Sequence, residues 1–453
     1  MGWTITGTGY GRAMHASDDA DDLCRFIDAA PSPRHAAAAL TVALDDAGYR
    51  RLELTAPRWD LTTGGAYVVR GAAVIAWSLR AAAPPRGVLA IGAHTDSPHL
   101  RLKPRPAYVS EGCLQLGVEV YGGALLNSWL DRDLGLAGAV FTPDGVAHPI
   151  RIARPVARVP QLAIHLDRKV NDDGLKLNPQ QHLAPMWGLA QADDDPARVF
   201  AELVAGAAGV AVEDLAGHDL SLYDLTPAGR GGARDELVFA ARLDNLASCH
   251  AGVTALLDAG GLGPDDVLPM LACFDHEEVG SGSTDGAGGP LLAVVIERIV
   301  TELGGDRSAY HACVASSLMA SADMAHGAHP NYGDRHEPRH KPALGGGPVL
   351  KSNHNQRYGT AGPGYARMVG LAAKAGVPLQ DFVTRTDLGC GSTIGPITAA
   401  RLGLAVVDLG APMLSMHSAR ECCAAIDHGR YVALLTAHLA ADLPATARRV
   451  TPV

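Results

Sequence analysis

The feature that most constrains the fold is an alternation of short apolar runs with helical segments. The run Val267–Phe274 is followed by a polar loop and then by a helix that Pro290 opens, and several further runs repeat this order. One of them, Glu236–Leu243, predicts a strand that leads to Asp244 and then to a helix. Units of strand and helix in succession build a mostly parallel sheet that helices cover. The sequence therefore predicts an α/β fold, and a chain of 453 residues that is 47% hydrophobic can fill a large core.

Residues 102–236 have a different character. From Leu114 to Val120, apolar residues alternate with polar or small ones, which is typical of a half-buried strand, and Pro143–Gly145 is a hairpin turn signal. We therefore predict a β-rich domain at residues 102–236. It would be inserted into an α/β domain formed by residues 1–101 and 237–453.

Charge and cysteine content exclude several classes of protein. Lys and Arg number 38 against 48 Asp and Glu, a formal charge of −10, which argues against a nucleic-acid surface. The eight cysteines are scattered without Cys-x-x-Cys spacing, as in a cytoplasmic protein with reduced thiols. The N-terminus lacks the features of a secretory signal, and no apolar run approaches the ~20 residues of a membrane span. We expect a soluble, cytoplasmic protein.

Histidines and acids stand at the ends of the apolar runs. Because the carboxyl ends of parallel strands meet at one edge of a sheet, where ligands bind, we expect these side chains to converge. A loop that would close over this edge carries one more histidine. The set consists of His94, Asp244, Glu277, Glu278, Asp323 and His417.

Two histidines and several carboxylates suit two zinc ions that share a carboxylate, with ligand distances of ~2.0–2.2 Å. Metals ~3.5–4 Å apart can clamp the attacking and the developing oxygen of a hydrolysis. The spare glutamate would be the general base. Asp96, two residues after His94, would fix the imidazole tautomer. Each residue alone could be an ordinary loop residue, so the prediction rests on their convergence.

Other motifs fit less well. The chain has no His-Glu-x-x-His helix of a single-zinc protease. The segment Gly345–Ser352 resembles a phosphate loop, but Leu350 stands where a glycine must precede the lysine. Paired acids alone could indicate a glycosidase, which would leave His94 and His417 unexplained.

Longer motifs give a specific resemblance. From about Ser17 to the C-terminus, the chain resembles the aspartyl aminopeptidases, a family of di-zinc metallopeptidases. The motifs, in chain order, are His94–Pro98 with Arg101–Lys103, Trp129–Leu134, Leu243–Asn245, Glu277–Ser281, Ser321–His326, His329–Tyr332, Asn355–Tyr358, Gly391–Ile397 and Met416–Glu421.

The resemblance implies a role for each matched residue. Two zinc ions per subunit would be held in two sets that share one aspartate, and the sites would also accept Mn²⁺ or Co²⁺. The implied ligands are His94, Asp244 and Asp323 for one ion, and Asp244, Glu278 and His417 for the other. Glu277 would deprotonate a water bridging the metals, and Asp96 would support His94.

Two further roles and an assembly follow from the resemblance. By its apolar surroundings His165 reads as structural, but the resemblance implies that it reaches a neighbouring subunit's active site and stabilises the tetrahedral intermediate. Lys351 is the candidate to bind the substrate's acidic side chain, since the net charge demands a local cation. The family also implies homodimers, formed through the inserted domain, that assemble into a tetrahedral homododecamer.

The predicted reaction is removal of an N-terminal residue, preferably Asp or Glu, from a peptide. Two alternatives stay open at the level of sequence. One is a related di-zinc exopeptidase or deacylase with another specificity. The other is a non-catalytic assembly stabilised by metal, although Glu277 would then have no purpose.

Overall fold

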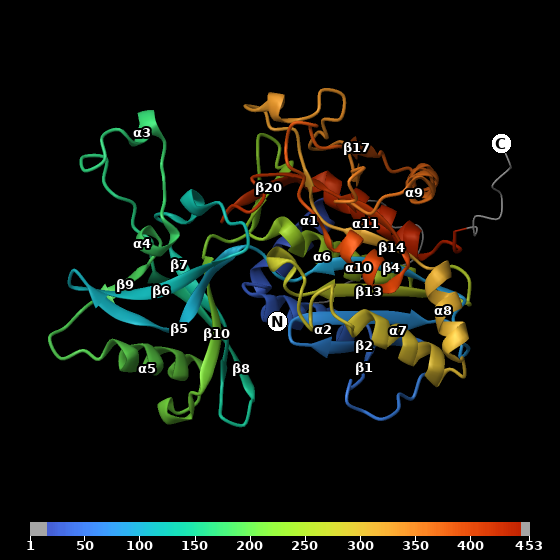
Figure 1. Ribbon diagram of the computed structural model, residues 1–453, viewed down its shortest axis with the longest axis horizontal. Helices are drawn as coiled ribbons and strands as arrows, with labels where there is room; N and C mark the ends of the chain where they lie inside the picture. The colour runs from blue at the N-terminus through green and yellow to red at the C-terminus, as the bar shows by residue number, and fades with distance from the viewer. Residues whose placement is uncertain (1–15, 445–453) are drawn as a thin grey trace.

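A computed structural model describes residues 16–444. Its central element is a mixed, mostly parallel nine-stranded sheet (Figure 1). Strands β4 and β13 run parallel, and every residue of both is buried, as expected for strands covered on both faces. In spatial order the sheet consists of β1 (Arg50–Arg51), β2 (Gly64–Arg70), β3 (Ala73–Leu79), β13 (Val267–Phe274), β4 (Gly87–His94), β14 (Leu318–Ala322), β18 (Ala405–Gly410), β16 (Val349–Lys351) and β17 (Gln380–Phe382).

Helices cover both faces of this sheet. Successive residues of β4 point to opposite faces, so Leu89 and Ile91 lie in one apolar core while Val88 and Ala90 lie in the other. The first core is completed by α1 (Ala16–Ala29), α2 (Pro33–Asp46), α6 (Leu243–Ala259), α9 (Gly362–Ala375) and α11 (Ala425–Leu439), and the second by α7 (Leu291–Glu302), α8 (Arg307–Ser316) and α10 (Ile394–Leu402).

A second sheet, antiparallel and six-stranded, lies to one side of the first (Figure 1). It has its own apolar core, to which Phe200 and Val204 of helix α5 (Pro196–Ala208) contribute. In spatial order its strands are β8 (Ala147–Ala157), β7 (Leu134–Phe141), β10 (Gly217–Asp224), β5 (His99–Ser110), β6 (Cys113–Tyr121) and β9 (Met186–Leu189).

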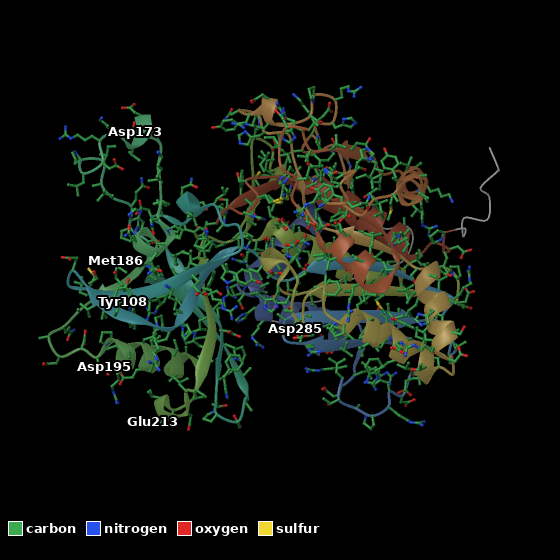
Figure 2. The ribbon with its side chains drawn as sticks, viewed as in Figure 1. Tyr108, Asp173, Met186, Asp195, Glu213 and Asp285 are labelled. Atoms are coloured by element: carbon green, nitrogen blue, oxygen red, sulfur yellow. The ribbon has the colours of Figure 1, made fainter. Side chains whose placement is uncertain are left out.

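The segment between β8 and β9 projects from the molecule. It carries two single-turn helices, α3 (Val170–Asp173) and α4 (Pro179–His182). In Figure 2, Asp173 lies at the outer end of this segment, while Tyr108 and Met186 lie on the sheet below it. We call residues 160–182 the projecting segment.

A third, five-stranded sheet gathers short strands from distant parts of the chain. Short 3-10 helices complete the structure at Leu126–Trp129, Val212–Asp214, Glu277–Val279 and Gly333–Arg335. In spatial order the sheet consists of β11 (Gly229–Gly231), β12 (Leu237–Ala240), β20 (Glu421–Ala424), β19 (Pro412–Leu414) and β15 (Ala325–His326).

The predicted α/β class is confirmed, with one error of detail. We predicted a strand from residue 236 to 243 within the parallel sheet. The strand is shorter, Leu237–Ala240, and pairs with β20 in the five-stranded sheet. The domain boundaries at 102 and 236 stay a prediction, and β5 begins at His99. The absence of a secretory signal was judged on residues outside those described, and within residues 16–444 no helix has the length and apolarity to span a bilayer.

Candidate metal centre

Three neighbouring strands of the nine-stranded sheet bring acids and a histidine to one edge. His94 is the last residue of β4 and pairs with Phe274, the last residue of β13. The chain leaves β13 through Asp275 and enters the 3-10 helix that begins at Glu277. Asp323 directly follows β14, on the other side of β4. The predicted convergence of these strand ends is therefore present in the geometry.

Asp244 reaches the same place by another route. It lies at the start of α6, where its backbone is not helical, and follows Arg242 in the left-handed region. The prediction that a strand of the parallel sheet positions Asp244 at this edge was wrong. Instead, a turn after β12 carries the carboxylate between the two histidines.

The six predicted side chains form one cluster in which Asp244 is central. One oxygen of Asp244 lies 3.5 Å from His94 Nε2, and the other lies 3.5 Å from His417 Nε2. His94 Nε2 is also 3.9 Å from Asp323 Oδ2. His417 Nε2 is 3.4 Å from Glu278 Oε2. The cluster therefore has two halves, His94 with Asp323 and His417 with Glu278, joined through Asp244.

Asp96 supports the cluster from below and is itself fully buried. His94 Nδ1 donates to the Asp96 carbonyl at 3.0 Å, which leaves Nε2 facing the cluster. The Asp96 carboxylate accepts from the backbone N–H groups of Glu277 and Glu278, both at 3.1 Å. It also accepts from the Tyr121 hydroxyl at 2.8 Å. Asp96 thus fixes the positions of His94, Glu277 and Glu278 relative to one another.

Lys351 lies beside Asp323 and is only 2% exposed. Its ammonium donates to the Asp323 carbonyl at 2.8 Å, to Asp323 Oδ1 at 3.3 Å and to the Met324 carbonyl at 3.2 Å. It also lies 5.3 Å from the centre of the Tyr358 ring. In this conformation Lys351 supports Asp323, and its part in binding substrate stays a prediction.

Sequence reasoning missed the role of Glu421. This residue is 2% exposed, and its carboxylate accepts from the backbone N–H of His417 at 2.7 Å and from that of Asp244 at 3.2 Å. Burial raises the pKa of Glu421 to about 8. Glu421 stands in the motif Met416–Glu421, but nothing in its spacing indicates that it is buried.

Burial and mutual repulsion govern the protons of the cluster. Burial raises the pKa of Glu277 to about 7 and that of Glu278 well above its usual value. Burial opposes the charged form of His417, but the carboxylates of Asp244 and Glu278 outweigh it and raise the pKa to about 10. The cluster therefore demands positive charge, which protons supply when no metal is bound.

These residues fit a divalent metal. One ligand atom from each of His94, Asp244 and Glu278 lies within 4.8 Å of the others. Asp244 Oδ1 and Glu278 Oε1 are buried, yet neither accepts a hydrogen bond from the described residues. A buried oxygen without a donor is costly unless a cation meets it. Nitrogen and carboxylate donors are the ligands of catalytic zinc.

His165 does not join the cluster. It lies in an exposed turn of the projecting segment, and no contact joins it to the six clustered residues within the described structure. The apolar residues around it are exposed as well, with Leu162 58% and Leu166 75% accessible. These residues do not pack into the core of their own subunit.

The segment that resembled a phosphate loop has another structural role. The backbone N–H groups of Gly345 and Gly347 donate to the Asp427 carboxylate at 2.6 and 2.8 Å. Asp427 is fully buried at the start of α11. The donors that would cradle a phosphate are occupied by an internal carboxylate, which agrees with rejecting that motif.

A cavity of about 310 Å³ lies next to the cluster. The segment Met413–Met416, which leads directly into His417, forms one wall, and Tyr358 and Phe382 form part of another. None of its described lining residues is acidic. The lining instead includes the basic or titratable residues His326, His329, Arg335, His336 and Arg385.

An α/β sheet whose edge gathers two histidines and several acids beside a cavity defines a metal-dependent hydrolase. Comparison with known proteins identifies the family. Residues 26–439 match the family model described as aminopeptidase I zinc metalloprotease (M18). The chain belongs to this family, and it is a zinc metallo-aminopeptidase.

Individual relatives agree with this assignment. A probable M18 family aminopeptidase 2 from Streptomyces coelicolor is 47% identical over 417 residues, which cover 90% of this chain and 94% of that protein. A solved complex of Ape4 and Nbr1 matches with a TM-score of 0.90 at 36% identity, covering 96% of this chain and 87% of that chain. The mApe1 dodecamer of S. cerevisiae matches with a TM-score of 0.80 at 27% identity, covering 93% and 96%. The predicted family is confirmed, and the non-catalytic alternative is excluded.

Proposed function

We propose that this chain removes an N-terminal Asp or Glu from peptides and that Glu277 takes the proton of the attacking water. The observation that carries the proposal is the placement of Glu277. Its carboxylate lies 4.0 Å from His94 Nε2 at the rim of the cluster, and burial raises its pKa to about 7. A carboxylate beside the ligand sets that belongs to neither of them can accept the proton of the water and return it to the leaving amine.

The proposed ligand sets follow the two halves of the cluster. His94, Asp244 and Asp323 would hold one ion, and Asp244, Glu278 and His417 the other. Zinc bound there would polarise the scissile carbonyl and make water more acidic, and Mn²⁺ or Co²⁺ would serve as substitutes. Asp96 would keep His94 and both glutamates oriented throughout the reaction.

The cavity beside the cluster supports the preference for an acidic first residue. Arg335 and Arg385 line it, the latter in an ion pair with Asp387, and Lys351 lies 5.3 Å from the ring of Tyr358, another lining residue. In a chain with a formal charge of −10, such a local group of cations is what would hold a carboxylate. We propose that Lys351 binds this carboxylate while it remains in contact with Asp323.

The projecting segment supports the proposed assembly. Leu162, Ile164, Leu166 and Leu175 are all at least 40% exposed, an apolar surface suited to contact with another subunit. His165 lies among them and would enter a neighbouring active site to stabilise the tetrahedral intermediate. The dodecamer formed by yeast mApe1 favours a homododecamer, built from dimers, here as well. The free state of all eight cysteines favours the cytoplasm.

A substrate panel tests the specificity. Peptides that begin with Asp, Asn, Glu, Gln, Ala or Leu, together with acyl-amino acids, separate an acidic aminopeptidase from a related exopeptidase or deacylase. We expect the Asp and Glu peptides to have the highest kcat/KM. Equal rates with Asp and Asn peptides would refute the acidic preference.

The variant Lys351→Met resolves the role of this lysine. If Lys351 binds the substrate carboxylate, its loss lowers kcat/KM for the Asp peptide more than for the Asn peptide. If it only supports Asp323, both rates fall by the same factor and metal content falls with them. Arg401→Met, a change at the basic end of α10, serves as the matched control.

A further inference from the structure

The end of strand β6 lies directly against the metal centre, although β6 belongs to the six-stranded sheet. Tyr121, its last residue, donates its hydroxyl to Asp96 Oδ2 at 2.8 Å. Two residues later, the Gly123 carbonyl lies 3.1 Å from His417 Nδ1. The backbone N–H of Leu125 also donates to the His417 carbonyl at 2.9 Å. One short segment therefore contacts both Asp96, which supports the cluster, and His417 of its second half.

The contact from Gly123 sets the tautomer of His417. A carbonyl oxygen can only accept, so Nδ1 must carry the hydrogen and Nε2 keeps its lone pair toward Asp244 and Glu278. His417 is 29% exposed, whereas His94 is 1% exposed. Because packing restrains the His417 ring less, its orientation depends on the hydrogen bond to the Gly123 carbonyl.

Two glycines make this close approach feasible. A Cβ at Gly122 would lie 3.0 Å from Glu278 Cβ and 3.3 Å from the Glu278 carbonyl oxygen. A Cβ at Gly123 would lie 3.3 Å from His417 Nδ1. The backbone at Gly122 is also left-handed, with φ at +69°. Any side chain at these positions would push against Glu278 or His417.

We propose that Tyr121–Gly123 is a positioning element that sets how tightly the Glu278–His417 half of the centre holds its metal. The proposal rests on the ligand roles given to these two residues in the proposed function. Through it, the six-stranded sheet contributes to the metal centre of its own subunit. Groups that orient a metal-bound histidine typically change metal affinity about 10–100-fold when they are removed.

The test substitutes Gly123→Ala in the full-length protein and compares it with Gly117→Ala. Gly117 lies within β6, the strand that leads to Gly123, and a Cβ there would make only an ordinary contact, 3.4 Å from Lys103 Cδ. Metal-free protein is titrated with Zn²⁺ and with Co²⁺, and calorimetry gives the affinity of each ion while the Co²⁺ absorption spectrum reports its coordination. Circular dichroism confirms that each variant is folded.

We expect Gly123→Ala to weaken the affinity for one of the two ions about 10–100-fold and to leave the affinity for the other unchanged. Gly117→Ala should change neither affinity. Wild-type affinity for both ions in Gly123→Ala would overturn the proposal. If Gly123→Ala does not fold, Tyr121→Phe decides, because it removes one hydroxyl and adds no atoms. Unchanged metal affinity and an unchanged Co²⁺ spectrum in Tyr121→Phe would then overturn it.

The outcomes for the wild-type protein separate this inference from the proposed function. Suppose that the wild-type chain binds two ions and cleaves acidic peptides, and that the Gly123→Ala variant does the same. This result would refute the positioning role of Tyr121–Gly123 and leave the proposed function intact. A wild-type chain that binds no pair of metals removes the proposed ligand sets, and the inference with them.

Discussion

The two halves of the metal centre are built in different ways. The first half, His94 with Asp323, stands at the ends of adjacent buried strands, and both residues are less than a tenth exposed. In the second half, Glu278 stands on a short 3-10 helix and His417 on a loop, where His417 has a left-handed backbone with φ at +69°. Strand pairing places the backbone of the first half, whereas the second half depends more on hydrogen bonds from other segments.

This difference indicates that the two ions are held unequally. A ligand at the end of a buried strand is positioned by the folding of the whole sheet. A ligand outside the strands keeps its orientation through hydrogen bonds: Asp96 holds Glu278, and Glu421 and Gly123 hold His417. We therefore expect a tight ion in the His94 half and a more exchangeable ion in the His417 half.

The strongest test removes the residue common to both halves. Because one carboxylate oxygen of Asp244 faces each histidine, Asp244→Ala should abolish binding of the metal pair. Loss of several kcal/mol of transition-state stabilisation lowers kcat/KM by at least about 10³-fold. Elemental analysis of the dialysed protein measures the metal. A variant that retains two ions would show that Asp244 is not shared.

Glu277→Gln separates catalysis from metal binding. Glutamine has the same shape but accepts no proton, so turnover should fall about 10²–10⁴-fold. Metal content should match the wild type, since Glu277 is in neither proposed ligand set. Glu297→Gln on helix α7 is the matched control. Near-normal turnover would remove Glu277 from its role as the base, and loss of one ion would make it a ligand.

Glu421→Gln should affect the two halves unequally. A carboxylate accepts from both the His417 and the Asp244 backbone N–H groups, but an amide has a single acceptor oxygen. One buried N–H therefore loses its partner, and metal affinity should fall about 10–100-fold, mainly for the more exchangeable ion. The control is Glu119→Gln, at an exposed position of β6. Equal weakening of both ions would contradict the proposed inequality of the halves.

The first half of the site was the part that the sequence predicted most directly. His94 and Asp323 follow apolar runs, and the rule that parallel strands end at one edge then brings them together. The same rule placed Asp244 correctly in space but for the wrong reason. Its strand belongs to the five-stranded sheet, and which sheet a short strand joins depends on distant partners that local pattern does not record.

The second half was indicated less directly: the strand-end rule also points to Glu278, but His417 entered only as a residue of a loop expected to close over the same edge. The loop that carries His417 has no periodicity, and the burial of Glu421 arises from pairing of β20 with β12, whose partners are about 180 residues apart. The contacts of Tyr121 and Gly123 were missed for the same reason, since they join two different sheets. Lys351 was predicted from its charge, but the sequence does not show that it is buried against Asp323.

The smallest predicted effect concerns the scaffold of the first half. His438 of α11 is fully buried, and its Nε2 donates to the Ala90 carbonyl of β4, the strand that ends at His94. Burial lowers the pKa of His438 to about 3. Below about pH 6.5, His438 therefore binds a proton in the unfolded chain but not in the folded one. Its contribution to stability is fully present above that pH and is lost progressively as the pH falls toward 3.

Between pH 7 and pH 5, this single histidine should lower the free energy of unfolding by about 2 kcal/mol, at about 1.4 kcal/mol per pH unit. His438→Gln keeps an N–H donor for Ala90 but does not titrate, so its free energy of unfolding should fall less over this range. Denaturant unfolding of the metal-free wild type and variant at both pH values measures the difference. An identical pH dependence in the two proteins would mean that His438 can be protonated in the folded protein. The packing of α11 against β4 would then be less rigid than the strand pairing of the first half implies.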